Sequence, residues 1–236
     1  MPHSLLNLTQ AAEFLRLSEG ELRALAVQGE IPCEKRGEQM MFKSEELDLW
    51  YSRHVIEAGA SPDARPVKPL KQRRVFRTLS ELCPRECVCA SLRGTTRASI
   101  IRELTQLADQ SGLLYDPNDL REEIERREEL GSTNIGGGIA IPHALVRDEG
   151  FFSDSFVCLA KLEKPSFFNS ACDGLPTELL ILSCSADSEE HLHILRLISN
   201  LCRQTRFSSR VREAESDDEL YEALILSEQE LPEKGI

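Results

Sequence analysis

The chain has 236 residues, enough for one large domain or two small ones, each with its own core. Its composition, 41% hydrophobic and 29% charged with a net charge of −12, is typical of a soluble globular protein. No apolar run approaches the ~20 residues that span a bilayer, which excludes a transmembrane protein. The first residues, Met1–Leu6, lack the basic region and long apolar stretch of a signal peptide, so we expect a cytoplasmic location.

Charge divides the chain into three segments. Residues 1–62 hold 6 basic and 10 acidic residues, residues 63–77 hold 6 and 1, and residues 78–236 hold 16 and 29. Three prolines fall between Ala60 and Pro69, a stretch with little apolar content. We therefore predict an N-terminal domain over 1–59, a basic, extended linker over 60–77 and a C-terminal domain over 78–236.

In chain order, the first predicted element is a helix that opens at residues 8–15, with Leu8, Ala11, Ala12 and Leu15 on one face. The segment 18–21, Ser-Glu-Gly-Glu, is a capping-box pattern that starts a second helix, and Gly29 is placed to end it. A small hairpin is expected around residues 35–42. A third helix, capped at residues 44–46, is expected to bury Leu47 and Trp50.

This order resembles the excisionase-type helix-turn-helix, a compact relative of the winged helix-turn-helix of MerR regulators. The resemblance rests on residues 8–12, 17–18, 29–32, 36–37, 42 and 47–50. It implies a small, mainly α-helical DNA-binding domain whose second helix enters the major groove. The candidate DNA contacts are Arg23, Gln28, Lys35 and Arg36.

The charge of the N-terminal domain leaves a second interpretation open. Phosphate neutralisation dominates DNA affinity, and the presumed recognition helix carries both Glu19 and Glu21. The module could instead contact a protein. The basic linker could offset the acidic balance by reaching phosphates beside the groove, or it could be a solvated tether.

The C-terminal segment alternates predicted strands and helices. Strands are expected at 87–92, 155–160 and 178–183. Helices are expected after a cap at Thr95 or Thr96, after Asn118, from Ser188 with Leu192, Leu195, Ile198 and Leu201 buried, and from Ser216. This alternation indicates an α/β architecture.

The eight cysteines are best interpreted as small buried hydrophobes in a reducing compartment. The cluster Cys83, Cys87 and Cys89 could suggest a thiolate metal site. However, Cys87 and Cys89 alternate along a strand-like run and no second CxxC pair completes a set of four ligands. We expect neither a metal nor a cofactor. The other five are Cys33, Cys158, Cys172, Cys184 and Cys202.

The residues with the clearest chemistry are those around His143. A glycine-rich, hydroxyl-bearing loop over 131–138 leads through a short apolar run to Pro142 and His143. Glycines let a backbone approach a phosphoryl group and direct N–H groups at it, and Pro142 restrains the frame of the histidine. A neutral imidazole is a good nucleophile near pH 7, although a histidine after Ile-Pro, taken alone, is more often structural.

The runs at 127–133, 136 and 138–143, followed by 173–174 and 190–193, resemble the signature of the mannitol/fructose and nitrogen-regulatory enzyme IIA family. The resemblance covers about residues 78–230 and implies a mixed sheet flanked by helices. It implies that His143 accepts a phosphoryl group from a carrier such as HPr, that His191 and Arg127 assist, and that Thr133 contributes a hydroxyl. His193 lies two residues from His191 and would face elsewhere on a helix, so we expect it to be peripheral.

Two functions follow from these resemblances. In the first, the protein is a regulator that couples the phosphorylation of His143 to a DNA-binding domain or to a regulated kinase. In the second, it relays phosphoryl groups to a separate IIB component during carbohydrate uptake, and the N-terminal module binds protein. The regulator is favoured, because a helix-turn-helix has no evident use in transport. Excisionase-type modules often work in pairs, so a homodimer is also a hypothesis.

Overall fold

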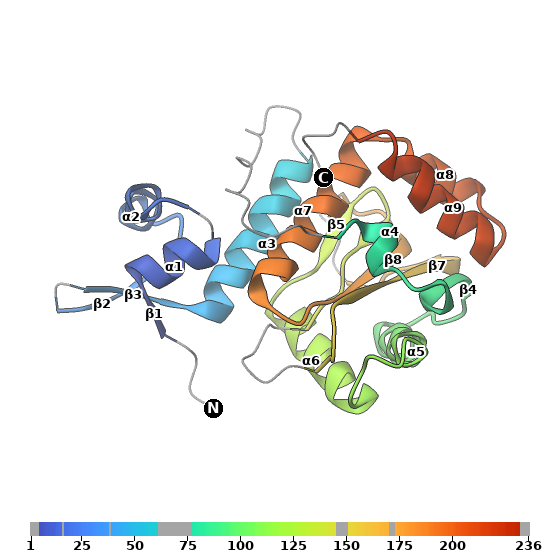
Figure 1. The fold of residues 1–236 in the computed structure, drawn as a ribbon, viewed down its shortest axis with the longest axis horizontal. Coiled ribbons are helices and arrows are strands. Elements are labelled where there is room, and N and C mark those ends of the chain that lie inside the picture. Colours follow the sequence, from blue (N-terminus) through green and yellow to red (C-terminus); the bar gives the residue numbers. More distant parts are fainter. Residues whose placement is uncertain are drawn as a thin grey trace.

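The computed structural model describes residues 5–15, 17–37, 39–60, 77–144, 151–169 and 173–231. Figure 1 shows a small N-terminal part and a larger C-terminal part, with helix α3 (Ser44–Ala60) reaching from the first to the second. No helix within these ranges combines the length and the apolar character needed to cross a membrane. Most of the predicted linker, residues 61–76, lies outside the described residues.

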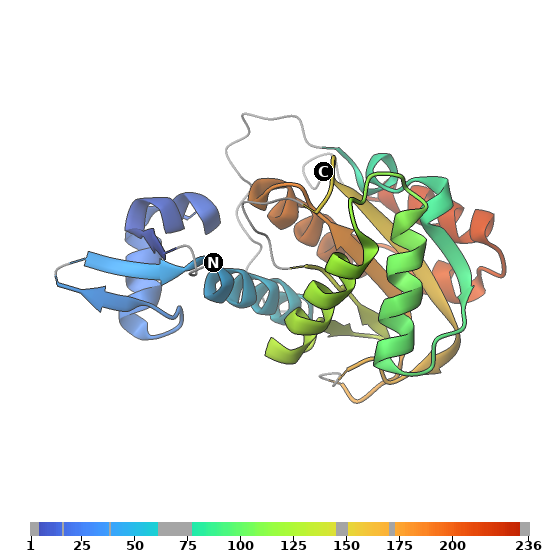
Figure 2. The ribbon, with the colours of Figure 1, turned by 90° about the horizontal axis from the view of Figure 1, so that it is seen from below.

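The N-terminal part is a helix-turn-helix with a small sheet. The three strands pair antiparallel in the order β1-β3-β2, so that β2 and β3 form the predicted hairpin. Figure 2 shows this hairpin projecting at the end of the molecule opposite the C-terminal part. The elements are β1 (Leu5–Asn7), α1 (Leu8–Leu15), α2 (Glu19–Gln28), β2 (Glu34–Arg36), β3 (Gln39–Lys43) and α3.

Local sequence signals account for the ends of helix α2. Ser18 accepts a hydrogen bond from the backbone N–H of Glu21, whose carboxylate accepts one from the N–H of Ser18. At the other end Gly29 has φ = 76°, a left-handed conformation that favours glycine. The capping box and the glycine stop are both confirmed.

The C-terminal part is a five-stranded mixed sheet with helices on both faces, which confirms the predicted α/β class. The strand order is β4-β7-β8-β6-β5; β4 and β7 are parallel, as are β6 and β8, and the other neighbours are antiparallel. The elements are α4 (Leu79–Leu82), β4 (Val88–Leu92), α5 (Arg97–Asp109), α6 (Pro117–Leu130), β5 (Asn134–Gly136), β6 (Ile139–Ala140), β7 (Phe156–Ser166), β8 (Thr177–Cys184), α7 (Ser188–Gln204), α8 (Phe207–Glu213) and α9 (Asp217–Glu228), with a 3-10 turn at Arg85–Cys87.

The central strands divide their side chains between two cores. Along β7, Val157 and Leu159 belong to one hydrophobic cluster, whereas Cys158 and Ala160 belong to the other. This period of two is expected of a strand buried on both faces. Helices α7 and α9 cover the first face, and α5 and α6 cover the second.

The first cluster does not stop at the boundary between the two parts. It continues from α7 into the N-terminal part, where it includes Leu22, Phe42, Leu47 and Tyr51. Leu47 is buried as predicted, and Trp50 is half-buried against the same cluster and stacks on His54 with ring centroids 4.6 Å apart. One continuous apolar core therefore joins the two parts.

Some local predictions were wrong. Helix α6 is capped by Asp116 and begins at Pro117, so Asn118 is not its cap, because proline suits the first helical position. The loop expected before His143 contains the short hairpin of β5 and β6. Of the cysteines, Cys172 lies outside the described residues; the other seven are free, four buried and three half-buried.

Candidate functional site

Three elements of the C-terminal part bring His143, His191 and Arg127 together. His143 lies just past β6 and forms a parallel bridge with Ser183 at the end of β8. His191 lies near the start of α7, which follows β8, and Arg127 lies in the last turn of α6. The site therefore forms at the carboxyl ends of the parallel strands β6 and β8, a common place for sites in α/β proteins.

Its hydrogen bonds assign the tautomer of His143. Nδ1 lies 2.8 Å from the carbonyl oxygen of Ile141, which can only accept, so Nδ1 carries the proton. Nε2 accepts a hydrogen bond from Nε of Arg127 at 3.0 Å, so Nε2 holds a lone pair. Burial, and next the positive charge of Arg127, lower the pKa of His143 to about 4. At neutral pH this histidine is an uncharged base with a defined nucleophilic nitrogen.

His191 and Arg127 are as deeply buried as His143. Both imidazoles are 1% exposed, and their ring centroids lie 5.0 Å apart. Arg127 is 2% exposed and also donates through Nη1 to the carbonyl of Gly131 at 3.0 Å, which anchors the guanidinium beside His143. Burial lowers the pKa of Arg127 from its ordinary value.

The fourth member of the cluster, Asp48, comes from helix α3 of the N-terminal part. Its Oδ1 lies 2.8 Å from Nε2 of His191. Its Oδ2 lies 3.7 Å from Nε2 of His143 and 3.9 Å from Nε of Arg127, beyond hydrogen-bond range of either. Burial acts to raise the pKa of Asp48, but its electrostatic interactions with the two histidines outweigh burial and lower the pKa.

Sequence reasoning missed Asp48 as a member of this site. The available signal was its position, since an acid between Leu47 and Leu49 is flanked by apolar residues on a helix with a buried face. Acids are almost never fully buried unless they are paired, so a buried Asp48 would have required a cationic partner. Nothing in the local pattern indicates that the partner lies about 80 to 140 positions away.

Thr133 does not contact His143. Its hydroxyl donates to Oε1 of Glu128, and its carbonyl accepts from the N–H of Ile141 at 3.0 Å. Glu128 is 2% exposed and also accepts from Nδ2 of Asn169 at 2.6 Å. Thr133 therefore positions the strand that leads to His143, and its predicted direct role stays a prediction.

The glycines before His143 form a turn and not a phosphate cradle. Gly136, Gly137 and Gly138 have φ between 64° and 84° and join β5 to β6. The N–H of Gly137 donates to Asp173 at 2.6 Å, so it is not directed at His143. This corrects the expectation from sequence for Gly137, whose N–H was expected to face the site.

His193 is buried but separate from His143. Its Nε2 lies 3.1 Å from the carbonyl oxygen of Arg77, and its Nδ1 lies 3.2 Å from Nη2 of Arg196. Because a carbonyl only accepts and a guanidinium only donates, Nε2 carries the proton. Burial lowers the pKa of His193 to about 4.

Asp48, His143 and His191 each offer a ligand atom, and these atoms lie within 4.8 Å of one another. Within the described ranges this is the one such group of three, and its two imidazoles and carboxylate are ordinary ligands of transition metals. The guanidinium of Arg127, however, donates to the same Nε2 that a cation would need. The positive charge of Arg127 beside His143 therefore disfavours a cation at this nitrogen.

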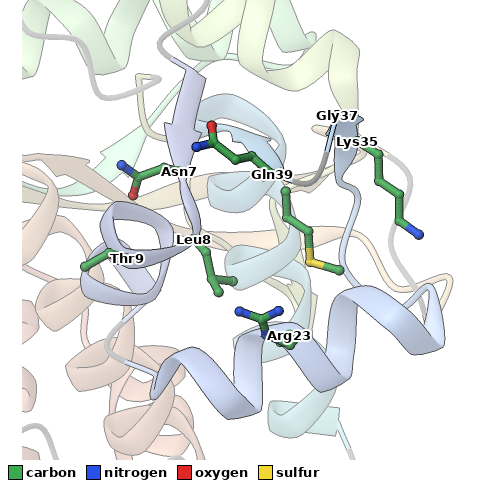
Figure 3. Close-up of a pocket in the computed structure, with 8 residues that line it drawn as sticks. Asn7, Leu8, Thr9, Arg23, Lys35, Gly37 and Gln39 are labelled. Atoms are coloured by element: carbon green, nitrogen blue, oxygen red, sulfur yellow. The ribbon is translucent and has the colours of Figure 1, made fainter.

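The predicted DNA contacts lie on a separate surface at the far end of the molecule. Arg23, Gln28, Lys35 and Arg36 are all exposed. Arg23 and Lys35 line a hollow of about 590 Å³ between α2 and the hairpin, together with Asn7, Leu8, Thr9, Gly37, Gln39 and Met40. Figure 3 shows Arg23 extending from α2 toward Leu8, whereas the amino group of Lys35 points outward.

The two acids of α2 are engaged within the N-terminal part. Glu19 accepts a hydrogen bond from the hydroxyl of Thr9 at 2.7 Å, and Glu21 belongs to the capping box of Ser18. Their charge remains, but each also stabilises the local fold. Their presence therefore does not by itself indicate that α2 avoids nucleic acid.

Two family models match this sequence. The model described as "Phosphoenolpyruvate-dependent sugar phosphotransferase system, EIIA 2" matches residues 81–227, and one described as "Helix-turn-helix domain" matches residues 5–55. The resemblances drawn from sequence are thereby confirmed in both parts.

Individual relatives are similar to the C-terminal part. The "Nitrogen regulatory protein" of Escherichia coli (strain K12) is 32% identical over 148 residues, covering 62% of this chain and 88% of the relative. The 2-O-alpha-mannosyl-D-glycerate-specific EIIABC component of the same organism is 28% identical over 159 residues, covering 65% of this chain but 23% of that protein.

Solved structures share the fold. The nitrogen regulatory protein IIA-Ntr of Neisseria meningitidis superposes with a TM-score of 0.54 at 22% identity, covering 61% of this chain and 97% of its own. Enzyme IIA mannitol in its complex with phosphorylated enzyme IIB from E. coli gives a TM-score of 0.53 at 20% identity, covering 64% and 99%.

Proposed function

Because this chain belongs to the EIIA 2 family of the phosphoenolpyruvate-dependent sugar phosphotransferase system, we propose that its C-terminal part accepts a phosphoryl group on Nε2 of His143. The donor is the phosphohistidine of a small phosphocarrier resembling HPr, in the cytoplasm. The observation that carries this proposal is the tautomer of His143, with its proton on the Ile141 side and its lone pair on Nε2.

The transfer balances without an added acid or base. The lone pair of Nε2 forms a new P–N bond while the P–N bond to the carrier's imidazole breaks, and the carrier's nitrogen leaves with that electron pair. The Nδ1 proton of His143 stays on its hydrogen bond to the carbonyl of Ile141, which stabilises the ring as it gains positive character. No water takes part, so one P–N bond is exchanged directly for another.

Two neighbours are suited to stabilise the transferred group. Arg127 can shift its Nε–H from the His143 lone pair to a phosphoryl oxygen, a charge-assisted hydrogen bond. His191 presents Nε2 from the first turns of α7, and the N-terminus of that 17-residue helix favours negative charge. We assign both residues to stabilising the phosphoryl group.

Phosphorylation with purified components tests this proposal. The full chain is incubated with phosphoenolpyruvate, enzyme I and HPr, and intact mass is measured after acid and base treatment. We expect an acid-labile, base-stable adduct of one phosphoryl group on the wild type and none on His143→Ala. His193→Gln serves as the matched control and should retain the adduct. A wild type without an adduct would contradict the proposal.

The N-terminal part supports a regulatory role for the phosphorylated site. Its second helix, α2, and its hairpin lie away from the C-terminal part, and Arg23, Gln28, Lys35 and Arg36 are exposed on them. We propose that these residues bind DNA, so that phosphorylation of His143 is reported to a regulated promoter. Relay of the phosphoryl group to a IIB component is the competing function.

Binding of labelled genomic fragments tests the regulatory role. Affinity that falls as salt rises, and that drops about tenfold in Arg23→Ala, is expected of phosphate or base contacts. Glu30→Ala, which removes an exposed charge near the same helix, is the control. If no fragment bound at any salt concentration, and the phosphoryl group passed rapidly to an added IIB protein, the relay would be favoured.

A further inference from the structure

Asp48 occupies the point at which the phosphoryl-handling side chains converge. His143, His191 and Arg127 all belong to the C-terminal part, whereas Asp48 belongs to helix α3 of the N-terminal part. Its carboxylate lies 2.8 Å from Nε2 of His191 and 3.7 Å from Nε2 of His143. A carboxylate and a phosphoryl group share negative charge and oxygen acceptors, so the same three side chains suit both.

Charge, and not a hydrogen-bond network, holds this carboxylate. Oδ1 and Oδ2 of Asp48 and Nε2 of His191 are buried without a partner of good hydrogen-bond geometry among the described residues. Burying a carboxylate is costly unless a cation compensates it, and Arg127 lies 3.9 Å from Oδ2. The site is thus built for an anion, yet Asp48 fits it imperfectly.

Contacts around Asp48 fix where α3 docks. One turn before it, Glu45 lies 3.7 Å from Nη1 of Arg126, the residue next to Arg127. One turn after it, Tyr51 is 7% exposed and belongs to the apolar cluster shared with α7. The same face of α3 therefore carries Glu45, Asp48 and Tyr51, spaced three residues apart, onto the C-terminal part.

We propose that helix α3 is an internal competitor for the phosphoryl site, with the Asp48 carboxylate standing where the phosphoryl group on His143 would lie. Docked α3 and phosphorylated His143 then exclude each other. This inference rests on the proposed function, because it assigns the regulation of the same site.

Two physical effects make the states exclusive. With α3 docked, His143 is 1% exposed. The phosphohistidine of a carrier then cannot come close enough for Nε2 to attack its phosphorus in line with the P–N bond that breaks. Once transferred, a phosphoryl group brings about −1.5 to −2 charges beside the carboxylate of Asp48, and like charges repel. By linkage, whatever releases α3 favours phosphorylation, and phosphorylation releases α3. The helix-turn-helix is attached to α3 and moves with it.

Chemical accessibility of His143 tests the docking without any phosphorylation. Unphosphorylated full chain is treated with diethyl pyrocarbonate, and modified histidines are mapped by mass spectrometry, with exposed His54 as internal reference. We expect His143 to react at least about tenfold faster in Asp48→Ala and Asp48→Lys than in the wild type. Both substitutions remove the carboxylate that holds α3 against His143, His191 and Arg127. Glu46→Ala, an acid on α3 that pairs with Lys43, is the control and should leave His143 protected.

Circular dichroism confirms that each variant is folded, and Asp48→Lys serves where Asp48→Ala is unstable. The measurement is repeated with EDTA. Equal reactivity of His143 in all variants would overturn the proposal. So would protection that EDTA abolishes, since a bound cation and not the carboxylate would then close the site.

Hydrogen exchange over residues 44–51 tests the release of α3. Phosphorylation by phosphoenolpyruvate, enzyme I and HPr should raise the hydrogen exchange of this segment. The initial rate of phosphorylation should be higher in Asp48→Ala than in the wild type. A phosphorylated wild type with unchanged exchange would overturn the competition and leave the proposed function standing. An absence of adduct on every variant, with His143 still exposed in Asp48→Ala, would instead overturn the proposed function and leave the docking intact.

Discussion

At the scale of single residues, two buried histidines each have a hydrogen-bond acceptor beside one ring nitrogen and a donor beside the other, which assigns their tautomers. His143 lies between the carbonyl of Ile141 and the guanidinium of Arg127, and His193 lies between the carbonyl of Arg77 and the guanidinium of Arg196. In each, one nitrogen donates and the other accepts, so only the neutral ring satisfies both neighbours. The arrangement leaves a lone pair on Nε2 of His143, and it connects His193 of α7 to the backbone of Arg77 at the start of the C-terminal part.

The pH dependence of the free energy of unfolding should reflect the protonation of His193. Its pKa is lowered to about 4, below the value near 6.5 of the unfolded chain. Between these values the unfolded chain binds a proton that the folded chain does not, so stability is lost as pH falls from about 6.5 toward 4. We expect His193→Gln to weaken this loss, because glutamine does not titrate.

Urea unfolding of wild type and His193→Gln at pH 7.5 and at pH 5 measures the effect. The variant is expected to be the less stable at pH 7.5, because Arg77 or Arg196 loses part of its hydrogen bonding, and to show the smaller drop on acidification. A drop equal to that of the wild type would assign the acid sensitivity to other groups, with His143 and its pKa of about 4 as the first alternative.

At the scale of elements, helix α2 has a glycine near each end, and the two have opposite conformational requirements. Gly29 ends the helix with φ = 76°, whereas Gly20 lies within its first turn. A Cβ added at either position meets nothing within 4 Å. Substitution by alanine therefore tests backbone conformation alone, without a contribution from packing.

We expect Gly29→Ala to destabilise the protein by about 1 kcal/mol, because alanine is strained in the left-handed region. Gly20→Ala should stabilise it by up to about 1 kcal/mol, because alanine has the higher helix propensity. Chemical denaturation of both variants gives the two signs. Effects of the same sign would show that the end of α2 is not held in the left-handed conformation in solution.

At the scale of the whole molecule, α3 makes two sequence-distant parts into one unit. The apolar cluster that contains Leu22 and Phe42 continues through Tyr51 into α7 and the first face of the sheet. The contact is completed by Asp48, whose Oδ1 lies 2.8 Å from Nε2 of His191. Stability of the N-terminal part is thus coupled to the state of the site.

The unphosphorylated protein should therefore unfold in one cooperative transition. Leu22→Ala in the N-terminal part and Leu120→Ala on the far face of the sheet each remove a fully buried side chain, at an expected cost of about 2–5 kcal/mol. Differential scanning calorimetry should show both variants lowering the same single Tm. If Leu22→Ala lowered only a separate, early transition, the two parts would be independent.

Much of the fold and part of the site could be predicted from the sequence. The capping box at Ser18, the glycine stop at Gly29 and the buried face of α7 are local patterns, and each was confirmed. Prediction failed where local signals competed. Asn118 and Asp116 are both good caps, and Pro117 decides between them. The glycines before His143 permitted either a phosphate cradle or a turn. They form a turn because the segment that follows them, β6, pairs with β8.

From local patterns alone, the two families in this chain could be recognised, and His143, His191 and Arg127 could be named as candidates, because family signatures and helix periodicity are short-range properties. The surroundings of Asp48 became visible only in the fold. In the sequence it is an acid on a helix of the helix-turn-helix domain, and in the fold it is the anion opposite His143 and His191. The energetic effect of a buried charge depends on the groups packed around it, and for Asp48 those groups come from segments far along the chain.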